Sequence, residues 1–171
     1  EIKNYFEEEK KKDVILLNEE ELGFDKNEYY KNSSSEKILR ATLKSELERN
    51  LDTETIVILD SLNYIKGYRY EWYCLARSAK TTLTNVYWEV DPEVAQKWNA
   101  ERDEKVAFSD ELFEDYKGRL EVPNPANRWD SPWFMLRSHE ETPLEDISKA
   151  VFEGKLPRAP VSNKHEESLD T

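Results

Sequence analysis

The chain has 171 residues and a formal net charge of −12, with 37 acidic side chains against 25 basic ones. This length suits one α/β domain with its own core, and the acidic balance argues against a nucleic-acid-binding surface on this segment by itself. A single cysteine excludes a disulfide framework and a cysteine metal site, and the sequence shows neither a signal peptide nor an apolar run of about 20 residues that could cross a membrane. We expect a soluble protein of a reducing, intracellular compartment with no membrane contact.

Strand and helix patterns alternate along the chain, as is typical of a parallel sheet flanked by helices. The first 12 residues have the pattern of the end of a helix, and residues 18–23 form an acidic turn followed by a polar loop. A capping box of Ser33 and Glu36 predicts the start of a longer helix, whose apolar face would consist of Ile38, Leu39, Thr42, Leu43 and Leu47.

The other expected elements follow from apolar periodicity, caps and prolines. In chain order they are strands over residues 14–17, 55–59, 83–90 and 133–136, and helices over residues 69–79, after Asp91 with Val94 and Trp98 inward, after Ser109, and from Pro143 to Gly154. Residues 123–132 form an irregular, proline-containing loop, and residues 155–171 read as a polar tail or linker.

Asp60 directly follows the apolar run of residues 55–59, which reads as a strand buried on both faces. A carboxylate at that position lies at the carboxyl edge of the sheet, where open α/β folds bind ligands. It fits a Walker B acid that orients magnesium beside nucleotide phosphates; the alternative is an aspartate that caps the following turn, which spacing alone favours because the Walker B pattern is degenerate.

Two sequence motifs around this position carry a resemblance to a known family. They are DSLNYIKGYRY, residues 60–70, and EVPNPANRWDSPWF, residues 121–134, in that order and preceded by LRATLKSELER, residues 39–49. Together they resemble the killer-toxin-insensitivity, Elongator-regulator family of P-loop ATPases, which is related to the kinase that phosphorylates seryl-tRNA for selenocysteine. Trp133 and Val122 depart from the usual residues of that family without removing an obvious functional group.

The resemblance implies a P-loop kinase-like α/β fold, with an ATPase domain over residues 1–154 and a linker over residues 155–171 that leads towards a C-terminal tRNA-binding region. The phosphate-binding loop of the family, GxxxxGK[ST], does not occur in these residues. In this fold the strand before that loop lies between the strand that ends at Asp60 and the next one, near Val90. We therefore expect further N-terminal residues that supply the strand and the loop.

The candidate site residues follow from position and from the resemblance. Asp60, Ser61 and Asn63 would contact ATP, with Asp60 orienting Mg²⁺ directly or through a water. Glu19 would orient a water or an acceptor hydroxyl, although residues 18–23 read equally well as a solvated acidic turn.

Four basic residues complete the candidate set. Arg119 and Arg128 flank the lid region of P-loop kinases, where an arginine neutralises charge on the γ-phosphate; the alternative is a salt bridge to Glu121 or Asp130. Lys66 and Arg69 are candidates for contact with a partner or tRNA, or else form an exposed basic turn and helix start.

The resemblance implies an ATP-binding and ATP-hydrolysing regulator of Elongator in tRNA wobble-uridine modification. Its cofactors would be ATP and Mg²⁺, its partners Elongator and tRNA, and its location the cytoplasm, with or without the nucleus. A kinase acting on an aminoacyl-tRNA or a small hydroxyl acceptor is one alternative, and a non-catalytic Elongator-binding scaffold is another.

Overall fold

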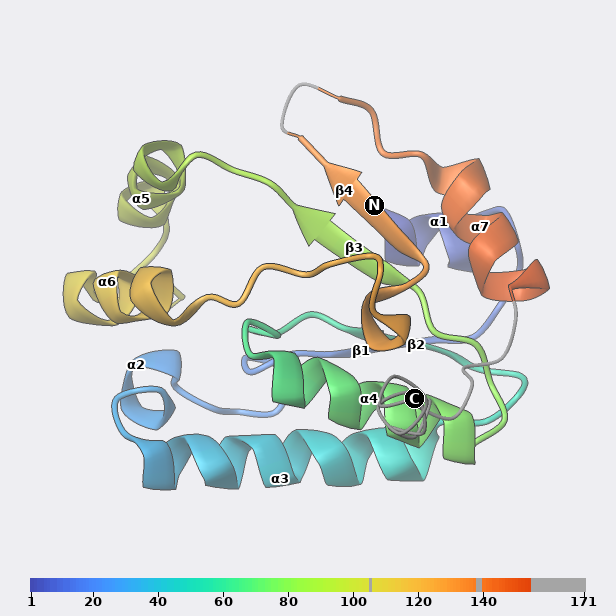
Figure 1. The fold of residues 1–171 in the computed structure, drawn as a ribbon, viewed down its shortest axis with the longest axis horizontal. Coiled ribbons are helices and arrows are strands. Elements are labelled where there is room, and N and C mark those ends of the chain that lie inside the picture. Colours follow the sequence, from blue (N-terminus) through green and yellow to red (C-terminus); the bar gives the residue numbers. More distant parts are fainter. Residues whose placement is uncertain (105, 138–139, 155–171) are drawn as a thin grey trace, which may run out of the picture.

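The structure is a computed structural model, and it describes residues 1–104, 106–137 and 140–154. Helices and strands alternate through it (Figure 1). They are α1 (Ile2–Glu8), β1 (Val14–Leu17), α2 (Lys26–Tyr29), α3 (Ser33–Asn50), β2 (Ile56–Leu59), α4 (Lys66–Ser78), β3 (Asn85–Trp88), α5 (Pro92–Glu101), α6 (Asp110–Arg119), the 3₁₀ turn η1 (Arg128–Asp130), β4 (Trp133–Leu136) and α7 (Leu144–Glu153). The tail expected over residues 155–171 lies outside the described residues.

The four strands form two parallel pairs. β1 pairs with β2, from Val14 opposite Ile56 to Leu17 opposite Leu59. β3 pairs with β4, from Asn85 opposite Trp133 to Trp88 opposite Leu136. Each of the four described strands has one partner, so β2 and β3, like β1 and β4, present one unpaired edge each. The parallel α/β class expected from the sequence is therefore confirmed.

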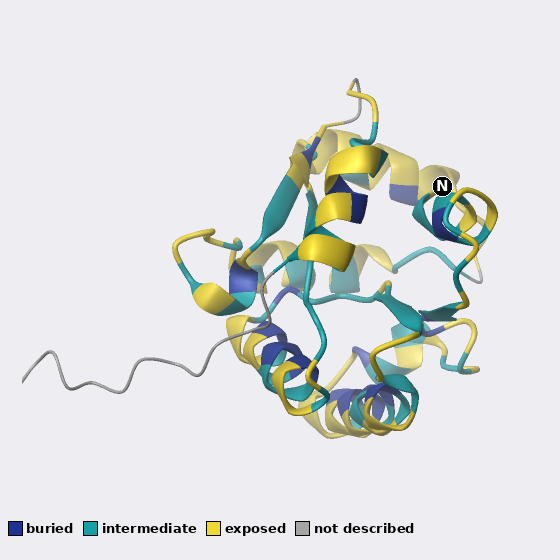
Figure 2. Cartoon of the chain, turned by 90° about the vertical axis from the view of Figure 1, so that its right-hand side faces the viewer, coloured by how far each residue is buried: buried dark blue, intermediate teal, exposed yellow. Residues whose placement is uncertain are grey.

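Helices cover the strands in the manner that parallel connections require. α3 and α4 lie side by side below the β1–β2 pair, α1 and α7 lie together behind β3 and β4, and α2, α5 and α6 gather at the end towards which the arrow of β3 points (Figure 1). Buried residues line the inward sides of the helices and exposed residues their outer sides (Figure 2). Among the described residues, no helix has the length and apolar character needed to cross a membrane.

The main core lies between α3, α4 and the β1–β2 pair. Leu39, Leu43 and Leu47 line one side of α3 and pack with Leu17 and Trp72. Their i, i+4, i+8 spacing is the apolar stripe of a surface helix, so the sequence identified this face correctly in part.

Two expectations about α3 were wrong. The cap is Asn32, whose side chain accepts a hydrogen bond from the Ser35 N–H at 2.9 Å, and not a Ser33–Glu36 box. Ile38 is 57% exposed, because Glu36 and Arg40 take the remaining places on the buried face. A hydrophobicity pattern misses these positions, since charged residues rarely occupy a core without partners.

The inward face predicted for α5 was also wrong. Val94 and Trp98 are both exposed, and the buried residue of this helix is Asn99. The Asn99 side chain donates to the carbonyl of Phe108 at 2.7 Å and accepts from its N–H at 2.8 Å. Asn99 thus fixes the connection between α5 and α6 with polar contacts, which no apolar stripe reveals.

The bounds of other helices and strands differ by a few residues from those expected from the sequence. α2 lies in the stretch expected to be a polar loop, α4 begins at Lys66 and not at residue 69, and β3 has four residues in place of the eight expected. The Ser109 cap of α6 is confirmed, since its hydroxyl accepts from the Leu112 N–H at 3.3 Å. Strand β4 has the bounds that the sequence predicts, and α7 begins one residue after Pro143, which stands in the cap position.

A buried ion pair fastens the loop of residues 123–132 to α4. Arg69 Nε donates to Asp130 Oδ1 at 2.7 Å, and both side chains are almost fully buried. The other oxygen of Asp130 accepts from the Asn124 N–H at 3.0 Å. The second sequence motif is thereby anchored to the first.

Removal of one member of this pair should destabilise the protein strongly, because the other charge would remain buried without its counter-ion. We expect Asp130→Ala and Arg69→Met each to lower the free energy of unfolding by about 3–5 kcal/mol, as measured by urea denaturation. Arg49→Met, which removes an exposed ion pair with Glu46, is the control and should cost less than about 1 kcal/mol. Equal losses of stability at both sites would show that the buried Arg69–Asp130 pair stabilises the fold no more than an exposed ion pair does.

Candidate functional site

The carboxyl ends of β1 and β2 meet at one edge of the sheet. The N–H of Asp60 donates to the carbonyl of Leu17 at 2.9 Å, which continues the ladder one step past the strands. Glu19 follows β1 by two residues and Asp60 follows β2 directly. The two acids that the sequence singled out are therefore brought together by strand pairing.

Glu19 is buried, with 1% of its surface exposed. Its Oε1 accepts hydrogen bonds from the Tyr30 hydroxyl at 2.6 Å and from the Ser61 hydroxyl at 2.5 Å. The Phe24 N–H donates to its backbone carbonyl at 2.8 Å. A solvated acidic turn is thus the wrong description of Glu19, because the carboxylate is enclosed and held by two hydroxyl donors.

Asp60 is exposed, whereas Glu19 is buried. Partial desolvation raises its pKa, and the neighbouring negative charge of Glu19 raises it further. The positive charges of Lys26 and Arg102 act in the opposite direction on the pKa of Asp60. An acid at a sheet edge that is close to a second acid and to two cations is a typical setting for a ligand site.

Lys26 and Arg102 were missed by the sequence reasoning. Lys26 lies in α2 and forms an ion pair with Glu20 at 2.7 Å, and Arg102 follows α5. Lys26 lies 34 residues before Asp60 and Arg102 lies 42 residues after it, so no local motif could have identified them.

Ser61 and Asn63, expected to contact ATP, both have internal partners. Ser61 donates to Glu19, as described above, and also lies 3.3 Å from the Tyr30 hydroxyl oxygen. The side-chain oxygen of Asn63 accepts from Trp72 Nε1 at 2.9 Å, and its carbonyl accepts from Arg69 Nη1 at 2.9 Å. Asn63 therefore holds the loop between β2 and α4, and its oxygen is not open to a nucleotide.

Lys66 and Arg69 occupy different surroundings. Lys66 is exposed, with Nζ 5.9 Å from the centre of the Trp129 ring. Arg69 is 6% exposed and paired with Asp130, so it does not lie at the surface, as a partner contact or an exposed helix start would require. We assign Arg69 a structural role.

The two candidate lid arginines lie on separate elements, Arg119 at the end of α6 and Arg128 at the start of η1. Arg119 is paired with Asp115 at 3.2 Å and with Glu36 at 3.5 Å, and its guanidinium lies 5.2 Å from the centre of the Tyr64 ring. Asp130, the partner considered for these arginines, is paired with Arg69. Arg128 is exposed.

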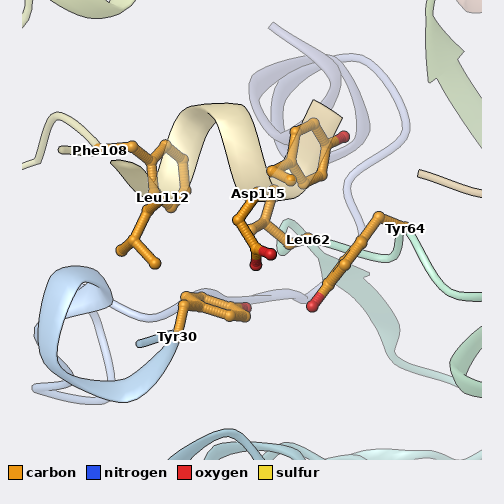
Figure 3. Close-up of a pocket in the computed structure, with 7 residues that line it drawn as sticks. Tyr30, Leu62, Tyr64, Phe108, Leu112 and Asp115 are labelled. Atoms are coloured by element: carbon orange, nitrogen blue, oxygen red, sulfur yellow. The ribbon is translucent and has the colours of Figure 1, made fainter. Parts of the chain in front are cut away.

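Helix α6 packs closely over this region. A cavity of about 10 Å³, at the lower limit for holding one water, lies between Leu112, Asp115 and Tyr116 of α6 and Tyr30 and Tyr64 (Figure 3). The Asn27 side chain of α2 donates to the Ala107 carbonyl at 3.0 Å and accepts from the Ser109 N–H at 2.8 Å. These contacts join the start of α6 to α2, and both lie at the same end of the molecule as α5 (Figure 1).

The donor set at Asp60 suits a magnesium ion that is shared with a ligand. Among the residues the structure describes, no three His, Cys, Asp or Glu side chains gather into a complete metal site. One exposed carboxylate, with waters and phosphate oxygens as the remaining ligands, is the usual environment of Mg²⁺ in nucleotide-binding proteins. Asp60 fits that role, and the cations whose charges act on it are Lys26, which is paired with Glu20, and Arg102.

Comparison with known proteins agrees with the two motifs. The model of the family described as "Chromatin associated protein KTI12" matches residues 1–170. Protein KTI12 homolog of Xenopus laevis is 41% identical over 157 residues, which are 92% of this chain and 57% of that protein. Protein KTI12 of Saccharomyces cerevisiae is 34% identical over 143 residues, which are 82% of this chain and 45% of that protein.

A solved structure is similar as well. The crystal structure of Chaetomium thermophilum Kti12 in complex with ADP-AlF3 matches with a TM-score of 0.76 and 32% sequence identity, over 89% of this chain and 86% of that one. This chain spans about half the length of the curated relatives it matches.

The raised pKa of Asp60 gives a prediction about stability and pH. A carboxyl whose pKa is higher in the folded chain penalises folding at neutral pH, and the penalty disappears as pH falls below the ordinary aspartate pKa. We expect Asp60→Asn to raise the free energy of unfolding at pH 7, with a gain that shrinks as the pH is lowered. Urea denaturation across this pH range measures the effect.

Asp52→Asn is the control with the opposite sign. Hydrogen bonds from the N–H groups of Glu54 and Thr55 lower the pKa of Asp52, so this carboxylate stabilises the fold at neutral pH. Its replacement should destabilise the protein at pH 7 and should matter less in acid. A loss of stability in Asp60→Asn at pH 7 would contradict the assignment.

Proposed function

The chain belongs to the KTI12 family, and on that premise we propose that the protein binds and hydrolyses ATP as a regulator associated with Elongator in tRNA wobble-uridine modification. The observation that carries the proposal is the placement of Asp60 at the carboxyl end of β2, next to the enclosed carboxylate of Glu19. Support comes from the Chaetomium thermophilum relative, which was crystallised with ADP-AlF3. In such a complex AlF3 stands in for the phosphoryl group that is being transferred.

Each residue of the site has a chemical role in this proposal. Asp60 would hold Mg²⁺ through its carboxylate, and the bound ion would supply charge neutralisation at the β- and γ-phosphates. Glu19, fixed by Tyr30 and Ser61, would orient the attacking water. Lys26 and Arg102 would offset phosphate charge from α2 and from the segment after α5.

We further propose that residues 1–154 are part of a P-loop ATPase domain and that residues 155–171 link it to a C-terminal tRNA-binding region. The strand that precedes the phosphate loop would lie between β2 and β3. The unpaired edges of β2 and β3 support this arrangement, because interior strands of a parallel sheet bond on both sides. The greater length of the relatives leaves room for such a segment.

Replacement of Asp60 tests the ATPase proposal in the natural protein with all its flanking residues. We expect Asp60→Asn to lower kcat for ATP hydrolysis by roughly 100-fold or more, the effect of removing one preorganised electrostatic group. Glu48→Gln, on the exposed side of α3, is the matched control and should leave kcat unchanged. Full activity in Asp60→Asn would contradict the role proposed for Asp60, whereas no ATP hydrolysis by the wild type would favour the non-catalytic scaffold.

The same assay separates hydrolysis from the kinase alternative. With γ-³²P-ATP and tRNA, release of free phosphate supports the ATPase. Label that remains on the tRNA or on another hydroxyl acceptor would replace the ATPase by a kinase.

Hydrogen exchange tests the position of the additional strand. Residues 1–171 alone should exchange the outward amides of β2 and β3 quickly, whereas the natural full-length protein should protect them through new backbone hydrogen bonds. The amides shared between β1 and β2 serve as the internal control, because they are bonded in both forms. Equal protection of the β2 and β3 edges in both proteins would contradict a strand between them.

A further inference from the structure

One buried guanidinium lies between two buried carboxylates beneath the candidate site. Arg40 extends from α3 towards the end of β1, where Glu19 is enclosed, and Glu36 lies one helical turn earlier on the same buried face. Arg40, Glu19 and Glu36 are each at most 5% exposed. Such charges persist in a core only when donors and counter-ions satisfy them, so their contacts define a single polar network.

Arg40 supports the donors of Glu19. Its Nη2 donates to the Tyr30 hydroxyl at 3.3 Å and also to the Leu62 carbonyl, and its Nη1 lies 3.5 Å from the Ser61 hydroxyl. Tyr30 and Ser61 are the two groups that donate to Glu19. Burial raises the pKa of Tyr30, which keeps its hydroxyl protonated as a donor.

Glu36 connects the same helix to α6. It accepts hydrogen bonds from the Tyr64 hydroxyl and, at 3.1 Å, from the Tyr68 hydroxyl. Arg119 of α6 reaches it at 3.5 Å, and 42% of the Arg119 side chain is exposed. The cation on α6 is thus the one member of this cluster that can withdraw into solvent at little cost.

One nitrogen of the Arg40 side chain takes no part in this network. Within the described residues, Arg40 Nε is buried and has no hydrogen-bond partner. The guanidinium also lies over the Tyr68 ring, 4.2 Å from its centre, and Tyr68 bonds to Glu36. Arg40 lies one helical turn from Glu36 on the buried face of α3. If Arg119 withdraws, the attraction between Arg40 and Glu36 opposes the hydrogen bonds of Arg40 to Tyr30 and Ser61.

We propose that Arg40 is a positioning residue that couples the docking of α6, through Arg119 and Glu36, to the placement of Glu19 and Ser61. With α6 docked, Arg119 balances Glu36 and Arg40 is free to hold the donors of Glu19. With α6 undocked, Arg40 is shared between two carboxylates and Glu19 loses its fixed orientation. The catalytic consequence rests on the proposed ATPase function.

A double-mutant cycle in the natural full-length protein tests the route. We expect Arg119→Gln and Glu36→Gln each to lower kcat by roughly 5- to 20-fold, with KM for ATP changed less than about 2-fold and with the melting temperature retained. The double variant should be no worse than either single one, because both break the same link. Arg49→Gln, another exposed arginine with a carboxylate partner, is the control and should leave kcat unchanged.

The cycle also separates coupling from direct action on the phosphate. If Arg119 acted on the γ-phosphate itself, its loss would cost the same factor in the Glu36→Gln background, and that additive result would overturn the proposal. Arg40→Lys keeps the positive charge but removes the planar guanidinium with its several N–H donors, so it should lower kcat. In this background Arg119→Gln should cause no further loss of kcat. Wild-type kcat in Arg40→Lys would likewise overturn it.

A readout without ATP distinguishes failure of this inference from failure of the proposed function. In nucleotide-free protein, Arg119→Gln should shift the ¹³C resonance of the Glu19 carboxyl group in the wild-type background and not in the Glu36→Gln background. No shift in either background would refute the coupling even if Asp60→Asn abolishes hydrolysis. A shift without any ATP hydrolysis by the wild type would refute the ATPase proposal alone.

Discussion

The register between β1 and β2 is the constraint on which the candidate site depends. Leu17 lies opposite Leu59, and the Asp60 N–H bonds back to the Leu17 carbonyl, so the segments after both strands leave the sheet at the same height. Glu19, Ser61 and Asp60 come together for this reason and not because of any local motif. A shift of one residue would turn every side chain of the strand to the other face and would separate the two acids.

Burial of carboxylates near this edge imposes the rest of the polar architecture. Glu19, Glu36 and Asp130 are almost fully buried, and each is met by hydroxyl groups, a guanidinium or both. Two of the cations involved, Arg40 and Arg69, are themselves buried, and Arg119 alone reaches solvent. The high acidic content of the chain is therefore only partly a surface property, because some of its acids fix the geometry of the loops that follow the strands.

The candidate site could be predicted in part. Asp60 and Glu19 were identified because an acid after an apolar strand has a defined position in a parallel sheet. Arg69 and Asn63 were assigned to ligands or partners, and the structure uses them inside the protein, with Asp130 and Trp72. Arg40 and Arg102 carried no signal, and Glu36 was predicted only as part of a helix cap. Their partners lie on other elements: Tyr30 for Arg40, Tyr64 for Glu36 and Asp60 for Arg102.

The sequence by itself determined the parallel α/β class, the order of the main helices and strands, the family, and the acid at the end of β2. These follow from apolar periodicity, helix caps and short sequence motifs, which are local properties of the chain. The tertiary structure alone decided which face of α3 is buried, which arginines are buried, and which edges of the described strands remain unpaired. Those outcomes depend on interactions between charged groups, or between backbone groups, that are far apart along the chain. Ile38 is exposed and Arg40 buried for this reason: hydrogen bonds to Tyr30 and Leu62 offset the cost of enclosing a guanidinium.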